Sequence, residues 1–324
     1  MRVGIIGAGW IAEKLALTMQ QMTDCKLYAI AARELSRAEA FRNQWGAAVA
    51  YGSYEELVCD PNVDLVYIAT PHSHHYRHTR LALEHGKPCL VEKAFTANAR
   101  QAEELIRLAR ERKLLLAEAI WTRYQPMLPI MRRTIASGII GPVTQITAGL
   151  TYMMRNKERI VRPDLCGGAM LDLGVYPINF LRMLLPIEHE RVEWHAWLGP
   201  TGMDMNDSMT FFYSDGTMAC LTCGCLAIGD NRGIVRGEKG WMEIDNCNNP
   251  QLMRVYNADR QLVEETRCPH QITGYEYEIL ACRDALLKGL TECPEMPLDE
   301  TLRVMQIMDE FRAAVGVHYP YDEK

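Results

Sequence analysis

A lysine, an aspartate and a tyrosine stand out as side chains that could move a proton. Lys93 follows the apolar run PCLV within the charged pair Glu92-Lys93, where a buried strand is expected to end. Asp172 and Tyr176 lie in GGAMLDLGVY, at a spacing that puts both on one face of a helix beginning near Gly168. A lysine ammonium beside a phenol stabilises the phenolate and lowers the tyrosine pKa. These residues predict general acid–base chemistry, with Asp172 orienting the lysine or a substrate hydroxyl.

Two points about this group stay open at the level of sequence. Lys93 and Tyr176 would titrate as a pair, so either could carry the proton. Each residue also has a purely structural interpretation. Glu92 could form an ion pair with an arginine elsewhere, and Asp172 and Tyr176 could be buried polar residues satisfied inside a core.

The first residues of the chain predict a dinucleotide site. Arg2 to Ile6 is suited to a buried strand, and it is followed by GAGWIA and a helical stretch. This order matches the G-x-G-x-x-A fingerprint, in which Gly7 permits a tight turn, Gly9 lets the backbone approach a pyrophosphate, and Ala12 keeps the helix close to the sheet. The free N–H groups at the helix start would then face the phosphates.

The segment AIAARELSRAEAF, at the end of the second predicted strand, bears on the choice between NADP and NAD. Arg33 follows the strand, with Ser36 and Arg37 one turn further on. Two guanidiniums and a hydroxyl favour the 2′-phosphate of NADP. Glu34 could instead accept hydrogen bonds from a ribose 2′-hydroxyl, so NAD stays open, as does a simple solvated helix start.

Histidines and cysteines could suggest a metal, but their setting argues against one. His72, His74 and His75 occur in TPHSHH, with no adjacent carboxylate or thiol, where a strand end would border the cofactor. We interpret them as hydrogen-bonding and helix-capping residues near the nicotinamide. The cysteines of TMACLTCGCLA have no histidine or second pair nearby. We therefore expect no metal.

The elements that must position these residues fall into two groups. Strands and helices alternate up to about residue 120, which predicts a doubly wound parallel sheet of Rossmann type in the α/β class. Beyond that point, strands joined by hairpin turns and two terminal helices predict an α+β domain with an open, mainly antiparallel sheet. We expect a nucleotide-binding domain over 1–120 and a substrate domain over 121–324.

Composition excludes several classes of protein. The 324 residues suit two domains, and a net charge of −6 gives no basic surface for nucleic acid or anionic membrane. No apolar run is long enough to span a membrane. Eleven cysteines without a pairing rhythm indicate reduced thiols in the cytoplasm. The expected partner is a small molecule.

Taken together, GAGWIA, TPHSHH, GKPCLVEKAF and GGAMLDLGVY resemble the Gfo/Idh/MocA oxidoreductase family over almost the whole chain. Ala94 replaces the proline usual in the family's EKP motif. Tyr176, where histidine is common, is similar to the branch that contains dihydrodiol and D-xylose dehydrogenases.

The resemblance implies roles for particular residues and a mode of association. Lys93, Asp172 and Tyr176 would be the catalytic group, and dimerisation would use the open face of the second sheet. The implied cofactor-lining residues are Gly7, Gly9, Trp10, Ile11, Arg33, Arg37, Thr70, His72, His75, Glu92 and Lys93, together with Trp121, Arg123 and Arg162.

The expected activity is reversible hydride transfer between NADP(H) and a carbinol or carbonyl carbon of a sugar or vicinal diol. Loops around 152–163 and Tyr275 would shape the substrate site. Two alternatives remain: a non-catalytic NADP-binding sensor or scaffold, and a metal-dependent lyase that uses the histidines. Residues that can transfer a proton argue against a protein that only binds NADP, because binding alone does not require them.

Overall fold

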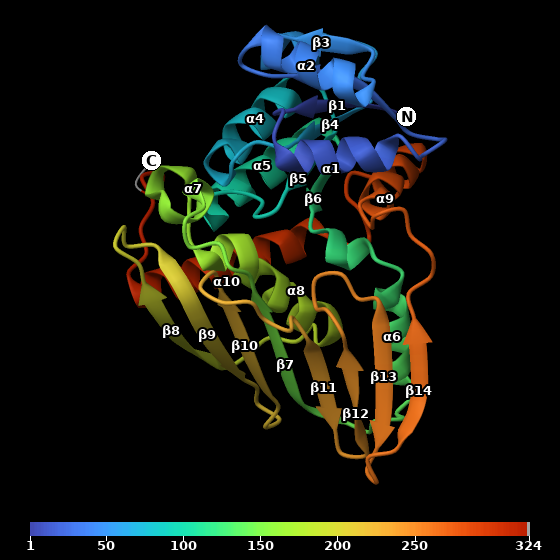
Figure 1. Ribbon diagram of the computed structural model, residues 1–324, viewed down its shortest axis with the longest axis vertical. Helices are drawn as coiled ribbons and strands as arrows, with labels where there is room; N and C mark the ends of the chain where they lie inside the picture. Colours follow the sequence, from blue (N-terminus) through green and yellow to red (C-terminus); the bar gives the residue numbers. More distant parts are fainter. Residues whose placement is uncertain (323–324) are drawn as a thin grey trace. The chain divides into compact units, whose positions relative to one another are not determined.

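The computed structural model describes residues 1–322, and its contacts divide the chain into two units (Figure 1). Unit 1 comprises Met1–Ile120, Gln271–Gln306 and the C-terminal residues from Tyr321, and unit 2 comprises Trp121–His270 and Ile307–Pro320. The predicted division near residue 120 coincides with the first boundary. The second predicted domain, 121–324, differs because residues 271–306 return to unit 1.

Unit 1 is a six-stranded parallel sheet in the order β3-β2-β1-β4-β5-β6. Its strands are β1 Arg2–Ile6, β2 Lys26–Ala31, β3 Val49–Tyr51, β4 Leu65–Ile68, β5 Cys89–Glu92 and β6 Leu116–Ala119. The strand order reverses between β1 and β4, and in such sheets ligands bind outside the carboxyl ends of the strands at this point. The Rossmann-type fold expected from the sequence is confirmed.

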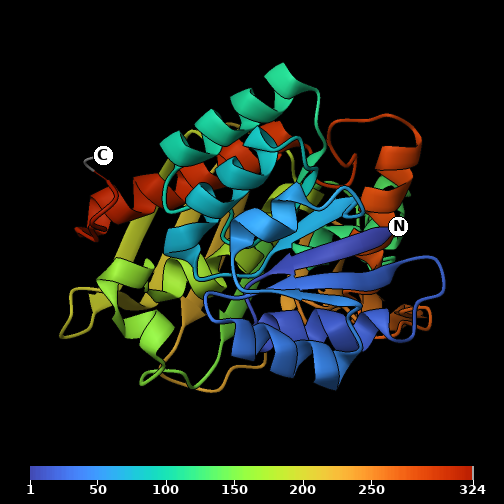
Figure 2. The same ribbon diagram turned by 90° about the horizontal axis from the view of Figure 1, so that it is seen from above.

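Helices cover both faces of this sheet. Figure 2 shows α1 and α2 on one side and α4 and α5 on the other. The helices of unit 1 are α1 Trp10–Met19, α2 Leu35–Trp45, α3 Tyr54–Cys59, α4 His72–Glu84, α5 Ala99–Arg112, α9 Glu276–Leu287 and the first part of α10 Leu298–Val315. The central strands are buried on both faces, which explains their continuous apolar sequences.

Several boundaries differ from the sequence-based expectation. The sequence predicts a helix over 36–44 and then a strand over 63–69, with no element between them, where the structure has β3 and α3. β3 is too short to show periodicity, although a capping box of Ser53 and Glu56 marks the start of α3. The sequence predicts the next helix over 75–85, whereas α4 begins at His72, with Pro71 as its N-cap residue.

Polar contacts that no local sequence pattern predicts join α9 to unit 1. Thr273, just before α9, shares a hydrogen bond of 2.6 Å with Thr18 of α1. Within α9, Arg283 forms an ion pair of 2.9 Å with Asp24. These partners are far apart in the sequence, so periodicity and turn signals could not assign this helix to the first unit.

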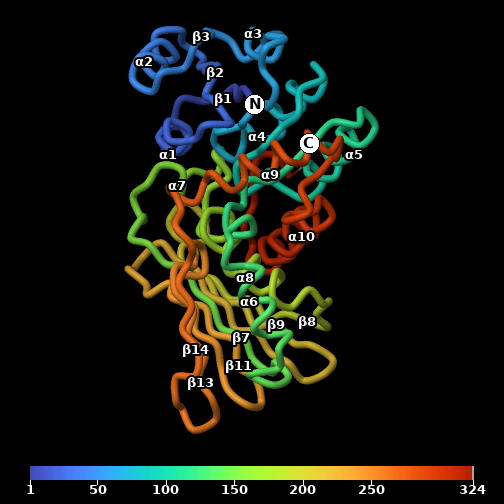
Figure 3. The backbone as a smooth tube through the Cα atoms, turned by 90° about the vertical axis from the view of Figure 1, so that its right-hand side faces the viewer, coloured from blue at the N-terminus to red at the C-terminus, as the bar shows by residue number. Residues whose placement is uncertain are grey.

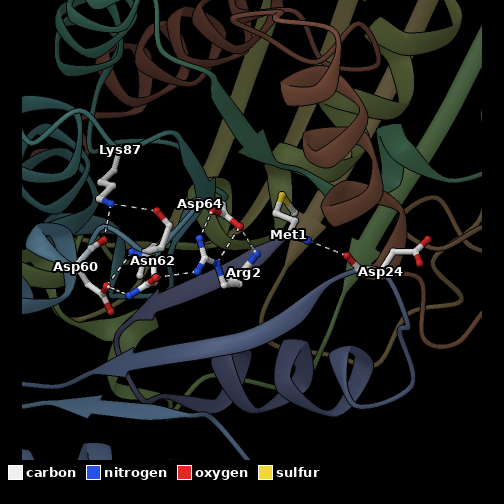
Figure 4. Close-up of polar contacts among 8 residues, drawn as sticks. Met1, Arg2, Asp24, Asp60, Asn62, Asp64 and Lys87 are labelled. Carbon is white, nitrogen blue, oxygen red and sulfur yellow. Dashed lines mark hydrogen bonds and ion pairs between the residues drawn. The ribbon is translucent and has the colours of Figure 1, made fainter.

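At the amino ends of β1 and β4, a polar network holds the edge of the sheet opposite the ligand-binding edge (Figure 4). The Arg2 backbone N–H donates to Asp64 Oδ2 at 2.7 Å, and its guanidinium donates to Asp64 Oδ1 at 3.1 Å. Lys87 Nζ donates to the carbonyls of Asp60 and Val63 at 2.5 and 3.0 Å. This network pins the start of β4 beside β1.

Unit 2 contains an eight-stranded sheet in the order β14-β13-β12-β11-β7-β10-β9-β8, which is antiparallel except for the parallel pair β7 and β10. Figure 3 shows β13 and β14 running side by side. The strands are β7 Val143–Thr151, β8 Arg191–Leu198, β9 Asp204–Phe212, β10 Met218–Gly224, β11 Gly233–Gly237, β12 Gly240–Ile244, β13 Leu252–Asn257 and β14 Leu262–Arg267. The expected open, mainly antiparallel sheet is confirmed.

One face of this sheet packs on helices. Phe180 of α8 is fully buried, and a Cβ at Gly233 of β11 would lie 2.3 Å from its ring, so only glycine fits there. The helical elements of unit 2 are the 3₁₀ turns Trp121–Tyr124 and Pro163–Leu165, α6 Met127–Ala136, α7 Glu158–Val161, the π-helix Met170–Gly174, α8 Val175–Leu184 and the last part of α10. In residues 1–322, no helix is both long and apolar enough to cross a membrane.

Candidate active site

The turn after β1 has the geometry that a pyrophosphate site requires. Gly7 has φ +103°, and a Cβ there would lie 2.9 Å from the carbonyl oxygen of Ala69. Gly9 caps α1, and a Cβ built on it would meet nothing within 4 Å. Ala12 is fully buried, as close packing of this helix on the sheet requires. The backbone beside Gly9 is thus open to a ligand.

The first turn of α1 continues this surface. Trp10 is 65% exposed, and the Lys14 ammonium lies 5.4 Å from the centre of its ring. No side chain caps the start of α1, so the N–H groups of its first turn, which includes Ile11, keep their capacity to bind an anion.

Three arginines act electrostatically on the phenol of Tyr54, and one of them also contacts this turn. Burial raises the pKa of Tyr54, whereas the positive charges of Arg33, Arg77 and Arg37 oppose that rise. Arg37 Nη2 also donates to the Ala8 carbonyl of the glycine turn, at 3.4 Å. The structure thus brings the two predicted arginines together and adds Arg77, which sequence reasoning missed.

These arginines are not neutralised by the protein. Within residues 1–322, none of Arg33, Arg37 and Arg77 forms an ion pair with a carboxylate, whereas Arg80, one turn beyond Arg77, pairs with Glu84 at 2.9 Å. Three exposed, uncompensated guanidiniums make a strongly positive cradle, and a phosphate group is the ligand that such a cradle fits.

Two histidines of α4, His75 and His78, are each held by a hydrogen-bond network at the end of β4. His75 is fully buried and lies 2.6 Å from the Thr70 carbonyl and 2.9 Å from the Ala94 carbonyl, so it links the segments that follow β4 and β5. Burial lowers its pKa to about 3. His72, at the start of α4, packs edge-on against the His75 ring with centroids 5.7 Å apart.

The second network fixes a tautomer. His78 Nε2 lies 3.1 Å from Arg77 Nη2, and Nδ1 lies 3.0 Å from Thr70 Oγ1. Because a guanidinium can only donate, Nε2 accepts and Nδ1 carries the proton, which it donates to Thr70. The histidines thus have protein partners, and in residues 1–322 no group of three or more candidate ligands is arranged to hold a metal ion.

Glu92 and Lys93 stand at the carboxyl end of β5. Glu92 is buried, and its Oε1 accepts a short hydrogen bond from Tyr67 of β4. Burial, followed by the charge of Glu92, raises the pKa of Tyr67 well above its ordinary value. Lys93 comes next, half-buried, and its peptide bond with Ala94 is cis. A tyrosine on the neighbouring strand is therefore a partner of Glu92.

In unit 2, Asp172 lies in the π-helix and Tyr176 at the start of α8. The expected single α-helix is wrong in this detail: the first turn is wider, a feature often found at functional sites. Asp172 is almost fully buried, and its Oδ2 lies 3.1 Å from Nη2 of Arg159 in α7. Sequence reasoning missed Arg159, since only the fold brings α7 to the π-helix.

Trp121, Arg123 and Arg162 all lie in unit 2. Trp121 and Arg123 form a 3₁₀ turn, and Arg123 is buried with Nε donating to Asn179 Oδ1 at 2.7 Å. Arg162 forms short ion pairs with Glu158 and Asp164 in its own loop. The charge of Arg162 is thus already balanced, in contrast to the arginines around Tyr54.

Comparison with protein families gives two matches. Residues 1–119 match the model described as "Oxidoreductase family, NAD-binding Rossmann fold", and residues 130–243 match the "GFO/IDH/MocA C-terminal domain".

Curated relatives match over the full length. The chain is 33% identical to the mouse (Mus musculus) and 35% identical to the Xenopus tropicalis proteins named trans-1,2-dihydrobenzene-1,2-diol dehydrogenase, covering 100% and 98% of this chain and 99% and 98% of theirs. Among solved structures, KijD10, a 3-ketoreductase from Actinomadura kijaniata in complex with NADP and TDP-benzene, has a TM-score of 0.86 at 26% identity, covering 97% of each chain. The resemblance drawn from the sequence is confirmed.

Proposed function

The chain belongs to the Gfo/Idh/MocA family of oxidoreductases, and from this premise we propose that it is an NADP(H)-dependent dehydrogenase or reductase of sugars or vicinal diols. The reaction would interconvert a CH–OH group and a carbonyl. The nicotinamide, when bound, supplies the acceptor or donor of hydride. The protein supplies the binding surface, the orientation of the substrate and the path of the proton.

The positive cradle is the observation that carries the proposal for NADP over NAD. The open backbone at Gly9 fits a pyrophosphate, and Arg37 contacts the same turn. Arg33, Arg37 and Arg77 all act on Tyr54 and have no carboxylate partners in residues 1–322. A 2′-phosphate would supply the negative charge that balances these arginines. Glu34, the acid that could have favoured NAD, is the N-cap residue of α2 and makes no side-chain capping bond.

The proton of the substrate hydroxyl would pass to Tyr176. A tyrosine with an ordinary pKa of about 10 is a poor base at neutral pH, so it needs a cation that favours the phenolate. Lys93 is the proposed cation. Its ammonium would stabilise the Tyr176 phenolate and donate a hydrogen bond to the substrate oxygen. In the reducing direction, the Tyr176 hydroxyl returns the proton to that oxygen.

Asp172 is proposed to orient Lys93 or a substrate hydroxyl. Its carboxylate is buried, and Arg159 holds Oδ2 in an ion pair of 3.1 Å. A carboxylate has several acceptor sites, so Asp172 can pair with Arg159 and also accept a hydrogen bond from a substrate or lysine donor. Arg159 is thus a positioning residue in the proposal.

Relatives guide the choice of substrate. The curated relatives are named for a vicinal diol, trans-1,2-dihydrobenzene-1,2-diol, and the similar solved structure is titled a 3-ketoreductase. Both reactions interconvert a carbinol and a carbonyl. We propose a cyclic diol or sugar-like ring as substrate, bound by unit 2 loops that include residues 152–163, with Tyr275, the N-cap residue of α9, also contributing.

A direct activity screen tests this proposal. The purified chain is mixed with NADP or NAD and a panel of aromatic diols, pentoses and hexoses, and the absorbance of the reduced nicotinamide is followed. NADP-dependent turnover of at least one vicinal diol or sugar is expected. Tight NADP binding without turnover of any member, in either direction, would instead favour a sensor or scaffold.

The protein is further proposed to form a homodimer through the sheet of unit 2. Along β7 and β13, side chains alternate between buried and half-buried, so one face stays partly exposed. On neighbouring strands, Trp241 stacks on Tyr256 with ring centres 4.8 Å apart. Light scattering on the purified chain should give twice the monomer mass, and Trp241→Glu should reduce it to the monomer mass.

A cytoplasmic location is proposed on chemical grounds. The eleven cysteines follow no disulfide framework, and several are buried, such as Cys89 and Cys223. Burial raises the pKa of both thiols, so they would persist as unreactive thiols in a reducing compartment.

A further inference from the structure

Two carboxylic acids of β9 lie buried beneath the π-helix that carries Asp172. Asp204 is fully buried and Asp207 is 4% exposed. Residues two positions apart on a regular strand point to the same face. Asp204 and Asp207 are three positions apart, so a regular strand would put them on opposite faces. The register between β8 and β9 shifts there: Trp197 pairs with Asn206, and Leu198 pairs with Asp204. This irregularity turns both acids to the buried face, as β-bulges do near functional sites.

Asp204 holds the start of the π-helix. Its Oδ2 accepts a hydrogen bond of 2.5 Å from the Met170 N–H, the first residue of that helix. The N-cap residue, Ala169, has no side chain that could do this. A carboxylate from another strand therefore satisfies a backbone donor that would otherwise be left without a partner at the helix start.

Gly168 is what allows the carboxylate to come so close. It has φ +110°, and a Cβ on it would lie 2.1 Å from Asp204 Oδ1. Any larger residue would push Asp204 away and would also strain the backbone. This contact explains why a glycine precedes the π-helix at position 168.

The two acids differ in the groups that hydrogen-bond to them. Cys223 Sγ donates to Asp207 Oδ2 at 3.1 Å. Within residues 1–322, Oδ1 of Asp204 and Oδ1 of Asp207 have no hydrogen-bond partner. Burial, followed by the charge of Asp204, raises the pKa of Asp207 well above its ordinary value. Burial raises the pKa of Asp204 as well, although the hydrogen bond from the Met170 N–H favours its charged form. The pair therefore tends to keep a proton, while the contact of Asp204 with Met170 stays in place.

We propose that Asp204 is a positioning residue for the reaction, because its carboxylate fixes the first turn of the π-helix and so the directions in which Asp172 and Tyr176 point. This inference rests on the proposed function of those two residues. Asp172 is two residues beyond Met170, so a loosened first turn would move its carboxylate away from Arg159. Positioning errors of about 1 Å cost on the order of a hundredfold in rate.

Asp204→Val tests the inference, because valine is close in size and cannot accept a hydrogen bond. We expect kcat to fall at least about tenfold while the Kd for NADPH changes less than about twofold. Asp204→Asn keeps one acceptor oxygen for the Met170 N–H and should recover most of the lost kcat. Asp207→Asn, the matched control, leaves Asp204 and its contact in place and should stay within about threefold of the wild-type rate.

Amide hydrogen exchange gives a readout that does not depend on activity. In Asp204→Val, exchange should accelerate in a peptide covering residues 166–177 and stay unchanged in unit 1. If Asp204→Val does not fold, Gly168→Ala is the second variant, because its methyl group would displace the carboxylate. It should show the same local exchange and the same loss of kcat.

The outcomes separate this inference from the proposed function. Wild-type kcat and wild-type exchange in folded Asp204→Val would overturn the inference. A folded variant in which kcat, NADPH affinity and melting temperature all fall would also overturn the inference, since that pattern indicates general destabilisation. If Tyr176→Phe retains full activity, the proposed reaction fails. If Tyr176→Phe is inactive but Asp204→Val is not, only the positioning role fails.

Discussion

Arg159 and Asp172 form an ion pair in which Nη2 of the half-exposed arginine lies 3.1 Å from Oδ2 of the buried aspartate. A buried carboxylate needs such a partner, because desolvation disfavours its charge. The same guanidinium donates to Met154 Sδ at 3.4 Å, so it is held from two sides. The proposed orienting carboxylate thus depends on a residue of a different helix.

Arg159→Ala should therefore lower kcat about tenfold, since the buried carboxylate would lose its ion pair with Arg159, and the exposure of the arginine keeps the effect modest. Arg159→Lys should restore much of the rate. Steady-state kinetics check both, with Arg155→Ala as a control, because Arg155 is an exposed arginine in the turn just before α7. Equal rates for Arg159→Ala and Arg155→Ala would remove Arg159 from the account.

Cofactor selection should depend on the arginines around Tyr54. Arg33→Ala, Arg37→Ala and Arg77→Ala should each weaken NADPH binding about tenfold or more and leave NADH binding nearly unchanged, because only NADPH carries the 2′-phosphate. Fluorescence titration measures both values of Kd. Arg42→Ala provides the control, since Arg42 lies on α2 and hydrogen-bonds Asn43 instead. Equal losses for both cofactors would contradict the phosphate cradle.

The contribution of the ion pair between Arg2 and Asp64 should appear in the stability of the protein at acid pH. Although burial opposes it, hydrogen bonds from Arg2 lower the pKa of Asp64 below its ordinary value of 3.8. A lowered pKa in the folded state stabilises the protein above pH 3.8, and this contribution is lost as the pH falls through the lowered pKa.

Asp64→Asn should thus lower the Tm at pH 7 by roughly 1–2 °C, and the difference should shrink toward pH 3, because exposed ion pairs contribute little. Differential scanning calorimetry at several pH values measures this. Asp259→Asn is the control, as Asp259 lies in an exposed turn. A difference that grows on acidification would show that the sign is wrong.

The sequence predicts unit 1 well because its signals are local. The glycine turn, the apolar strands and the alternation of helices are each contained in a few neighbouring residues, and they correctly predict a parallel sheet. β3 was missed because three residues carry no period. The packing of α9 on unit 1 was missed because it depends on pairs such as Thr18 and Thr273.

The candidate site is only partly predictable for the same reason. Gly7, Arg33 and Lys93 stand beside strand ends, so their places follow from the order of elements. Arg77 and Asp204 carry no such local signal. Arg77 becomes notable only when Arg33 and Arg37 are seen nearby, and Asp204 only when the strand irregularity turns it beneath Met170.

The central claim, proton transfer by Tyr176 assisted by Lys93, is tested most directly by turnover of Tyr176→Phe and Lys93→Met on the best substrate, with NADPH affinity measured in parallel. Both variants should lose at least about a hundredfold in kcat and keep the wild-type Kd for NADPH, as expected when a general acid–base group is removed. Wild-type kcat in either variant would contradict the claim for that residue.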